Sequence, residues 1–212
     1  MHTLYGYEGS GSAAIEAALQ QAGVAFRVVP AASWDGKSAV DELARVNPLK
    51  QIPTLVLPDG TVLSESAAIL MHLGLAHPAS GLLPTDLVAR SLALRGLVFI
   101  AANCYSAISV GDFPERWTTA SDDASRAAVK AAARERLHAH WAVFADLHPQ
   151  RPFLGGAAPG ALDLLASVVS RWSGTRAHLA QARPDFSALL QRVDGHPAYA
   201  PIFVRHWPPK KA

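Results

Sequence analysis

The apolar positions in the first third of the chain follow two different periods. Short apolar runs at residues 3–7 and 26–29 are typical of strands. Between them, apolar residues recur at the spacing of one helix face. The residues on that face are Ile15, Ala18, Leu19 and Ala22, and Gly23 follows at a position where glycine commonly ends a helix. The pattern predicts a strand–helix–strand unit.

A hairpin and a further helix are predicted next. Residues 54–57 and 62–63 are apolar and flank an Asp-Gly pair at residues 59–60, a combination that favours a tight antiparallel turn. A helix is expected to start at residues 64–66 and to stop at Gly74. The first 76 residues therefore predict one compact α/β unit.

The strand pattern disappears from about residue 84. The predicted helical segments are residues 85–107, 121–147, 161–173, 185–193 and 197–204. Ser121 is expected to cap the second of these segments, and Asp163 to cap the third from one side, because Gly160 stands where a serine or threonine is common. We predict an α/β domain at residues 1–76, a linker at 77–83 and an all-helical domain at 84–207.

Composition and charge reduce the number of possible classes of function. The chain is 50% hydrophobic, and its formal net charge of +2 is too small to suggest a nucleic-acid groove or a membrane-binding face. The single cysteine, Cys104, fits a reducing compartment. The first residues lack the pattern of a secretory signal, and the apolar run at residues 92–110 is interrupted by Arg95 and Asn103. We expect a soluble, cytoplasmic protein.

Two segments of the α/β unit have the chemistry of a peptide-binding site. Pro53 stands just before a predicted strand, where it has no N–H to give to a sheet, so the backbone of Ile52 is left free for an extended ligand. Glu65 and Ser66 open a helix whose free N–H groups suit a carboxylate, and Glu65 itself suits an ammonium group. Together these segments predict a site for a small zwitterionic peptide.

This combination resembles the glutathione site of the cytosolic glutathione transferases, in particular the bacterial theta-like and beta-like members. The resemblance covers nearly the whole chain. It implies a thioredoxin-like N-terminal domain, an all-helical C-terminal domain and a homodimer. It also implies a cis Ile52–Pro53 bond, with Ile52 on the cysteinyl part of glutathione and Glu65 with Ser66 on its γ-glutamyl end.

The resemblance extends to further candidate residues. Lys50 and Gln51 match positions that often reach the glycyl carboxylate or the peptide flank. Ser10 falls where theta-like members place a serine that activates the thiol, and Ser12, itself a candidate helix cap, is the second choice. An apolar pocket for a small electrophile is expected to involve Tyr7, Tyr105 and Trp117. Glutathione is then a co-substrate, and no other cofactor is expected.

Alternatives remain open. The glycines of Gly9-x-Gly11-x-x-Ala14 imitate a dinucleotide fingerprint, but the second strand ends without the acid that would hold a ribose. A transferase-like binding or assembly module without activity is a further possibility. No His-Glu-x-x-His pattern occurs, so no metal site is expected. The sequence does not separate conjugation from peroxide reduction, dehalogenation or isomerisation, although the lack of a Ser-Ser-Cys-like loop argues against isomerisation.

Overall fold

The computed structural model describes residues 1–148 and 152–209. Its N-terminal part holds one four-stranded sheet with the strand order β2-β1-β3-β4. The strands are β1 (His2–Gly6), β2 (Phe26–Pro30), β3 (Thr54–Val56) and β4 (Val62–Leu63). β1 pairs in parallel with β2, whereas β3 is antiparallel to both β1 and β4. The strand–helix–strand unit and the hairpin predicted from sequence are therefore confirmed, and the mixed sheet differs from the parallel sheet of a dinucleotide fold.

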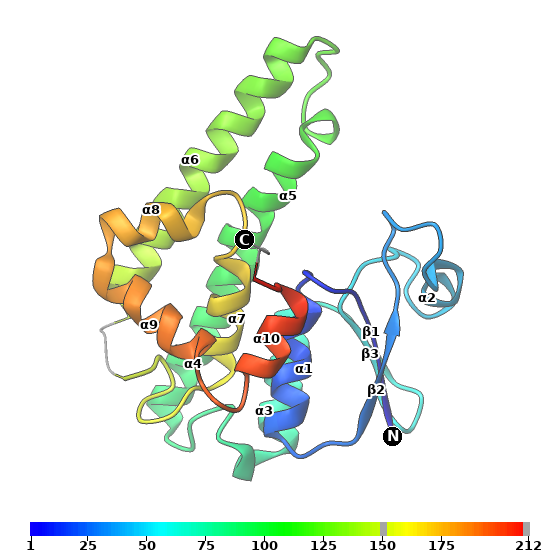
Figure 1. Ribbon diagram of the computed structural model, residues 1–212, viewed down its shortest axis with the longest axis vertical. Coiled ribbons are helices and arrows are strands. Elements are labelled where there is room, and N and C mark those ends of the chain that lie inside the picture. The colour runs from blue at the N-terminus through cyan, green and yellow to red at the C-terminus, as the bar shows by residue number, and fades with distance from the viewer. Residues whose placement is uncertain (149–151, 210–212) are drawn as a thin grey trace.

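Three helices cover this sheet. They are α1 (Ser12–Gln21), α2 (Val40–Val46) and α3 (Ser66–Ala76). α1 and α3 lie together on one face, and α2 lies on the other (Figure 1). The expected helix stop at Gly74 is wrong. A side chain there would overlap Leu83, 2.4 Å from the position of a Cβ, so this glycine serves close packing inside the helix.

Helices make up the second part of the chain. After the short 3-10 helix Pro78–Ser80, they are α4 (Leu87–Phe99), a π-helical segment (Ile100–Tyr105), α5 (Ser106–Asp112), the 3-10 helix Pro114–Arg116, α6 (Asp123–Leu147), α7 (Ala161–Val169), α8 (Thr175–Ala182), α9 (Pro184–Asp194) and α10 (Ala200–His206). α5 and the first half of α6 project as an arm (Figure 1).

Three expectations for this part need correction. The helix predicted at residues 85–107 runs on to Asp112 and contains the π-helical segment, and α8 was not predicted at all. The N-cap of α6 is Asp122 rather than Ser121, because Asp122 Oδ1 accepts a hydrogen bond from the amide of Ser125 at 2.8 Å.

α7 joins the two parts of the molecule. All nine of its residues are buried, and it packs against α1 and α3 on one side and against α4 and α9 on the other. Asp163 organises its start, as predicted: its carboxylate accepts hydrogen bonds from the amides of Leu154, Gly155 and Gly160 at 2.7, 2.8 and 2.9 Å. A side chain at Gly160 would meet the carbonyl of Leu82 at 2.8 Å, which explains why no serine or threonine stands there.

The continuous helical run from Leu87 to Asp112 is long and apolar enough to cross a membrane by length and composition. Several of its apolar side chains are exposed together with one on α3. These residues, called the α3/α4 apolar face below, are Leu75, Leu87, Val88, Leu92 and Val98. The run is also part of the folded core, because Leu97, Ile100 and Cys104 are fully buried.

Candidate active site

The loop before β3 is organised by buried polar groups. Asn47 Nδ2 donates hydrogen bonds to the carbonyl of Gln51 at 3.2 Å and to Thr54 Oγ1 at 2.9 Å, and Thr54 Oγ1 donates to the Gln51 carbonyl at 2.8 Å. These contacts support the Ile52–Pro53 peptide bond, which is cis as the family resemblance implied. Within the described residues the N–H and C=O of Ile52 have no hydrogen-bond partner. A short backbone edge is therefore available to an extended ligand.

The start of α3 provides a second polar surface. Glu65 is the N-cap, with φ at 64°, a conformation that few residues other than glycine adopt. Among the described residues no side chain caps this helix, so the N–H groups of its first turn are available to an anion. Glu65 is exposed, and Ser66 is buried in the first turn. Lys50 has a positive φ of 54° as well, so unusual backbone conformations occur in both predicted binding segments.

The two candidate thiol-activating serines bond to each other and to one carbonyl. Ser10 Oγ donates to the carbonyl of Tyr7 at 2.7 Å and lies 2.9 Å from Ser12 Oγ. Ser12 Oγ is 3.2 Å from the same carbonyl and also accepts the amide of Tyr7 at 3.2 Å. Ser12 is the first residue of α1 and Gly11 is its N-cap, so the expectation of a Ser12 cap is wrong. Its hydroxyl stabilises the preceding loop instead.

The Tyr105 side chain reaches this loop from the helical part. An ideal Cβ built on Gly11 would lie 2.5 Å from the Tyr105 hydroxyl oxygen and 3.5 Å from Pro53 Cδ. The start of α1, the cis proline and the Tyr105 hydroxyl therefore converge at one point. Burial raises the pKa of Tyr105 to about 12, and the carboxylate of Glu65 adds to this shift, so Tyr105 is protonated at neutral pH.

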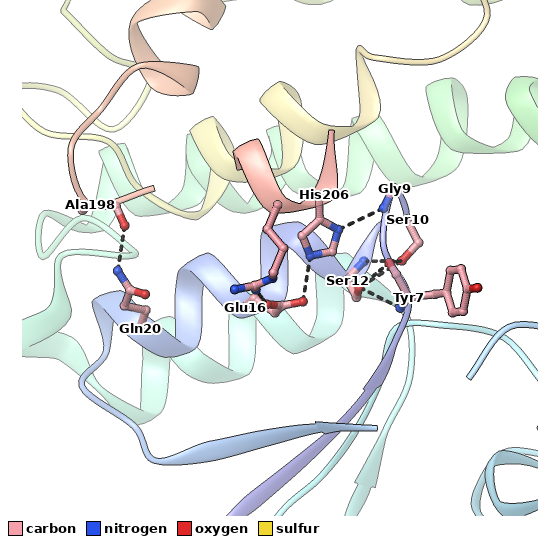
Figure 2. A network of polar contacts seen from close by, with 9 residues as sticks. Tyr7, Gly9, Ser10, Ser12, Glu16, Gln20, Ala198 and His206 are labelled. Atoms are coloured by element: carbon pink, nitrogen blue, oxygen red, sulfur yellow. Dashed lines mark hydrogen bonds and ion pairs between the residues drawn. The ribbon is translucent and has the colours of Figure 1, made fainter. Parts of the chain in front are cut away.

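The remaining predicted residues lie in different surroundings. The Tyr7 hydroxyl donates to Asp35 Oδ2 at 2.7 Å, and this bond raises the pKa of Tyr7. In Figure 2 the Tyr7 ring points away from α1. Trp117 is exposed and follows the 3-10 helix at the end of the α5–α6 arm. Lys50 and Gln51 are exposed beside the cis proline.

One polar network at the site was not predicted from the sequence. Glu16 of α1 is almost fully buried and pairs with Arg205 and with His206 Nε2, the latter at 2.7 Å. His206 Nδ1 accepts a hydrogen bond from the amide of Gly9 at 3.2 Å (Figure 2). An acid inside the otherwise apolar stretch at residues 13–19 was the available signal, because a buried carboxylate needs a partner.

A cavity of about 640 Å³ lies beside this network. Its lining comes from β2, α1, α10 and the end of β1 with the loop that follows. It includes Tyr7, Glu16 and His206, but not Pro53 or Glu65. In the described part of the chain, no group of three or more His, Cys, Asp or Glu side chains is arranged to hold a metal ion.

Comparisons with known proteins give a consistent result. Residues 2–74 match the family model described as glutathione S-transferase, N-terminal domain. The chain is 31% identical over 201 residues to the probable glutathione S-transferase BZ2 of Zea mays, covering 85% of this chain and 80% of that protein. It is also similar to a solved sphingomonad glutathione S-transferase complexed with glutathione. That likeness has 26% identity and a TM-score of 0.76, and it covers 96% of this chain and 98% of the other.

A further curated relative matches over a shorter stretch. The chain is 35% identical over 118 residues to the uncharacterized GST-like protein YncG of Escherichia coli (strain K12), which is 55% of this chain. The match spans 57% of the length of YncG.

Proposed function

Because the chain belongs to the glutathione transferase family, we propose that it binds reduced glutathione and activates the thiol for attack on a small apolar electrophile. The observation that carries this proposal is the unpaired backbone of Ile52 beside the uncapped start of α3. An extended tripeptide can pair its cysteinyl backbone with Ile52. The α-carboxylate of its γ-glutamyl end then meets the N–H groups of α3, and its ammonium group meets Glu65.

The chemical task is a change in thiol ionisation. A free thiol has a pKa of about 8.5, so about 3% is thiolate at pH 7. To lower the thiol pKa by about 2 units, the site must stabilise the thiolate by roughly 2.7 kcal/mol. Most of the thiol is then in the nucleophilic thiolate form at pH 7. The positive N-terminus of α1 favours the anion. The thiol proton goes to solvent, and the sulfur donates an electron pair to form a bond to carbon. With an aryl halide the carbon–halogen bond breaks, and halide leaves with its electron pair.

Ser10 remains our candidate for a hydroxyl contact to the sulfur. To donate there, its hydroxyl must turn away from the carbonyl of Tyr7. Ser12 Oγ lies 3.2 Å from that carbonyl and can keep it paired, so the rotation leaves no buried acceptor unsatisfied. Either of the two serine hydroxyls can therefore donate the hydrogen bond to the carbonyl of Tyr7 that stabilises the loop.

The same geometry favours one alternative function. Both serine hydroxyls have partners within the loop, which fits a glutathione-binding module that does not ionise the thiol. Ser10→Ala separates the two functions. Loss of conjugation with an activated aryl halide, with glutathione binding retained, supports the transferase. An unchanged thiol pKa and unchanged activity contradict the role of Ser10.

The binding site is tested directly by calorimetric titration with glutathione. For Glu65→Gln we expect the dissociation constant to rise by about tenfold or more, because a charge-assisted contact to the ammonium is lost. The exposed Glu135 on α6 provides a matched control, and Glu135→Gln is expected to bind as the wild type does. Equal affinities for the two variants would contradict the proposed orientation of the peptide.

We also propose that the protein is a cytoplasmic homodimer with a role in detoxification. The α3/α4 apolar face exposes five large aliphatic side chains, and a second copy of the chain would cover them. The double variant Val88→Lys, Leu92→Glu is expected to elute as a monomer, whereas the wild type elutes as a dimer with its mass measured by light scattering. A monomeric wild type would contradict this assembly.

A further inference from the structure

The hydroxyl of Tyr105 lies where the start of α1 and the cis proline come together. It lies so close to the α-carbon of Gly11 that a Cβ there would be 2.5 Å away, and Pro53 Cδ borders the same point. Gly11 is the N-cap of α1, so the hydroxyl lies at the positive end of that helix. Because Pro53 borders Gly11, a tripeptide whose cysteinyl backbone pairs with Ile52 would lie beside the start of α1.

The hydroxyls on the loop before α1 and at its first residue have partners. Ser10 Oγ donates to the carbonyl of Tyr7, Ser12 Oγ bonds to the same loop, and the Tyr7 hydroxyl donates to Asp35. Within residues 1–148 and 152–209, the Tyr105 hydroxyl has no hydrogen-bond partner. Its proton is therefore free to meet a ligand.

Local structure holds the Tyr105 side chain in this position. Tyr105 ends the π-helical segment between α4 and α5, and such segments often occur at functional sites. The carbonyl of Asn103 within the segment accepts a hydrogen bond from His140 Nδ1 at 3.0 Å, which anchors the segment to α6. The ring of Trp172 packs against the Tyr105 ring with the centroids 5.7 Å apart. The hydroxyl is thus held by packing on one side and by Gly11 on the other.

We propose that the Tyr105 hydroxyl donates a hydrogen bond to the sulfur of bound glutathione, which makes Tyr105 a catalytic residue contributed by the helical part. This inference rests on the proposed function. Its chemistry is simple: the thiol proton goes to solvent, and Tyr105 keeps its own proton while it stabilises the thiolate. A phenol with a pKa of about 12 stays a donor throughout the range in which a thiol ionises. A hydrogen bond to an anion in a partly buried site is of the stronger, charge-assisted kind.

The test is a titration of the thiolate absorbance of glutathione bound to the wild type and to Tyr105→Phe. We expect the variant to keep its affinity for S-methylglutathione within about threefold, because the peptide contacts lie elsewhere. We expect the pKa of the bound thiol to rise by about one unit, with a roughly tenfold loss of kcat/KM below that pKa.

Tyr199→Phe is the matched control. The Tyr199 hydroxyl has a pKa also raised to about 12 by burial, and it donates to Gln21 Oε1 at 2.7 Å, away from the cis proline. The control should leave the pKa of the bound thiol unchanged. A wild type that does not bind glutathione overturns the proposed function and this inference with it. Binding that persists in Tyr105→Phe with an unshifted thiol pKa overturns the role of Tyr105 alone.

Discussion

The imidazole of His206 accepts a hydrogen bond from the amide of Gly9, although the two residues are 197 positions apart in the chain. An amide N–H only donates, so Nδ1 of His206 carries no proton. The other ring nitrogen, Nε2, therefore carries the proton and donates it to Glu16 Oε1 at 2.7 Å. α10 thus holds the loop between β1 and α1, which contains Ser10 of the candidate site.

Two substitutions of His206 distinguish its hydrogen bond with the amide of Gly9 from its hydrogen bond with Glu16. His206→Asn places an acceptor near the position of Nδ1, and His206→Gln places a donor near the position of Nε2. We expect the amide of Gly9 to exchange hydrogen about 3- to 10-fold faster in His206→Gln than in His206→Asn, which corresponds to the net worth of one hydrogen bond, about 0.5–1.5 kcal/mol. Hydrogen exchange followed by NMR measures the difference. Equal exchange rates in the two variants would show that the bond does not restrain the loop.

Gly11 and Tyr105 are expected to be coupled sterically. Gly11→Ala introduces a Cβ that overlaps the Tyr105 hydroxyl oxygen at 2.5 Å, whereas the Cζ atom of that ring lies at an acceptable 3.6 Å. We expect Gly11→Ala to lower the free energy of unfolding by about 1–3 kcal/mol in the wild-type background. In the Tyr105→Phe background most of this cost should disappear. Chemical denaturation of the four proteins gives the coupling energy, and a value near zero would contradict the close approach.

The ionisation of Asp163 should make stability depend on pH. Burial raises its pKa to about 6, although three backbone N–H groups oppose the shift. Between the unfolded pKa of about 3.9 and this value, the folded state holds a proton that the unfolded state lacks, so stability falls as pH rises. We expect this group to contribute a loss of about 2 kcal/mol between pH 4 and pH 6.

Asp163→Asn isolates that contribution. The amide NH₂ of the variant faces backbone donors, so we expect it to be less stable by about 1–3 kcal/mol at pH 7. The stability advantage of the wild type over this variant should be larger at pH 4 than at pH 6. A constant difference across this range, measured by denaturation, would show that Asp163 has an ordinary pKa.

Cys104 should be unreactive in the folded protein. It is fully buried in the core, and burial raises its pKa to about 12. At pH 8 the thiolate fraction is then lower than that of a free thiol by about 1000-fold or more. We expect a disulfide reagent to label the native protein very slowly and to label one thiol per chain after denaturation. Rapid labelling of the native protein would show that this part of the core opens readily.

Local signals allowed much of the fold to be predicted. The Asp-Gly pair at residues 59–60 predicted the β3–β4 hairpin, and Gly60 has the positive φ of 89° that such a turn requires. The position of Pro53 before a strand predicted the free backbone edge of Ile52, and the family resemblance implied the cis bond. These features depend on residues close together in the chain, and they could be interpreted without knowledge of the tertiary contacts.

The features that the sequence did not predict depend on contacts between residues far apart in the chain. Gly74 looked like a helix stop, but its role is set by Leu83 of the following segment. The π-helical segment has no sequence signal of its own, and its carbonyl at Asn103 is paired by His140 from another helix. The pairing of Glu16 with His206 joins the first helix to the last. Each of these contacts exists only after the chain has folded.

The bond between Gly9 and His206 has a consequence for biosynthesis. The loop that contains Ser10 is translated before α10, the helix that holds it, and α10 follows all the other described helices and strands. The sheet and α1 can form during translation, but the buried carboxylate of Glu16 must then wait for Arg205 and His206. A nascent chain that still lacks these residues carries an unpaired acid on its interior face, so the candidate site is completed only when α10 has emerged, and not together with the sheet and α1.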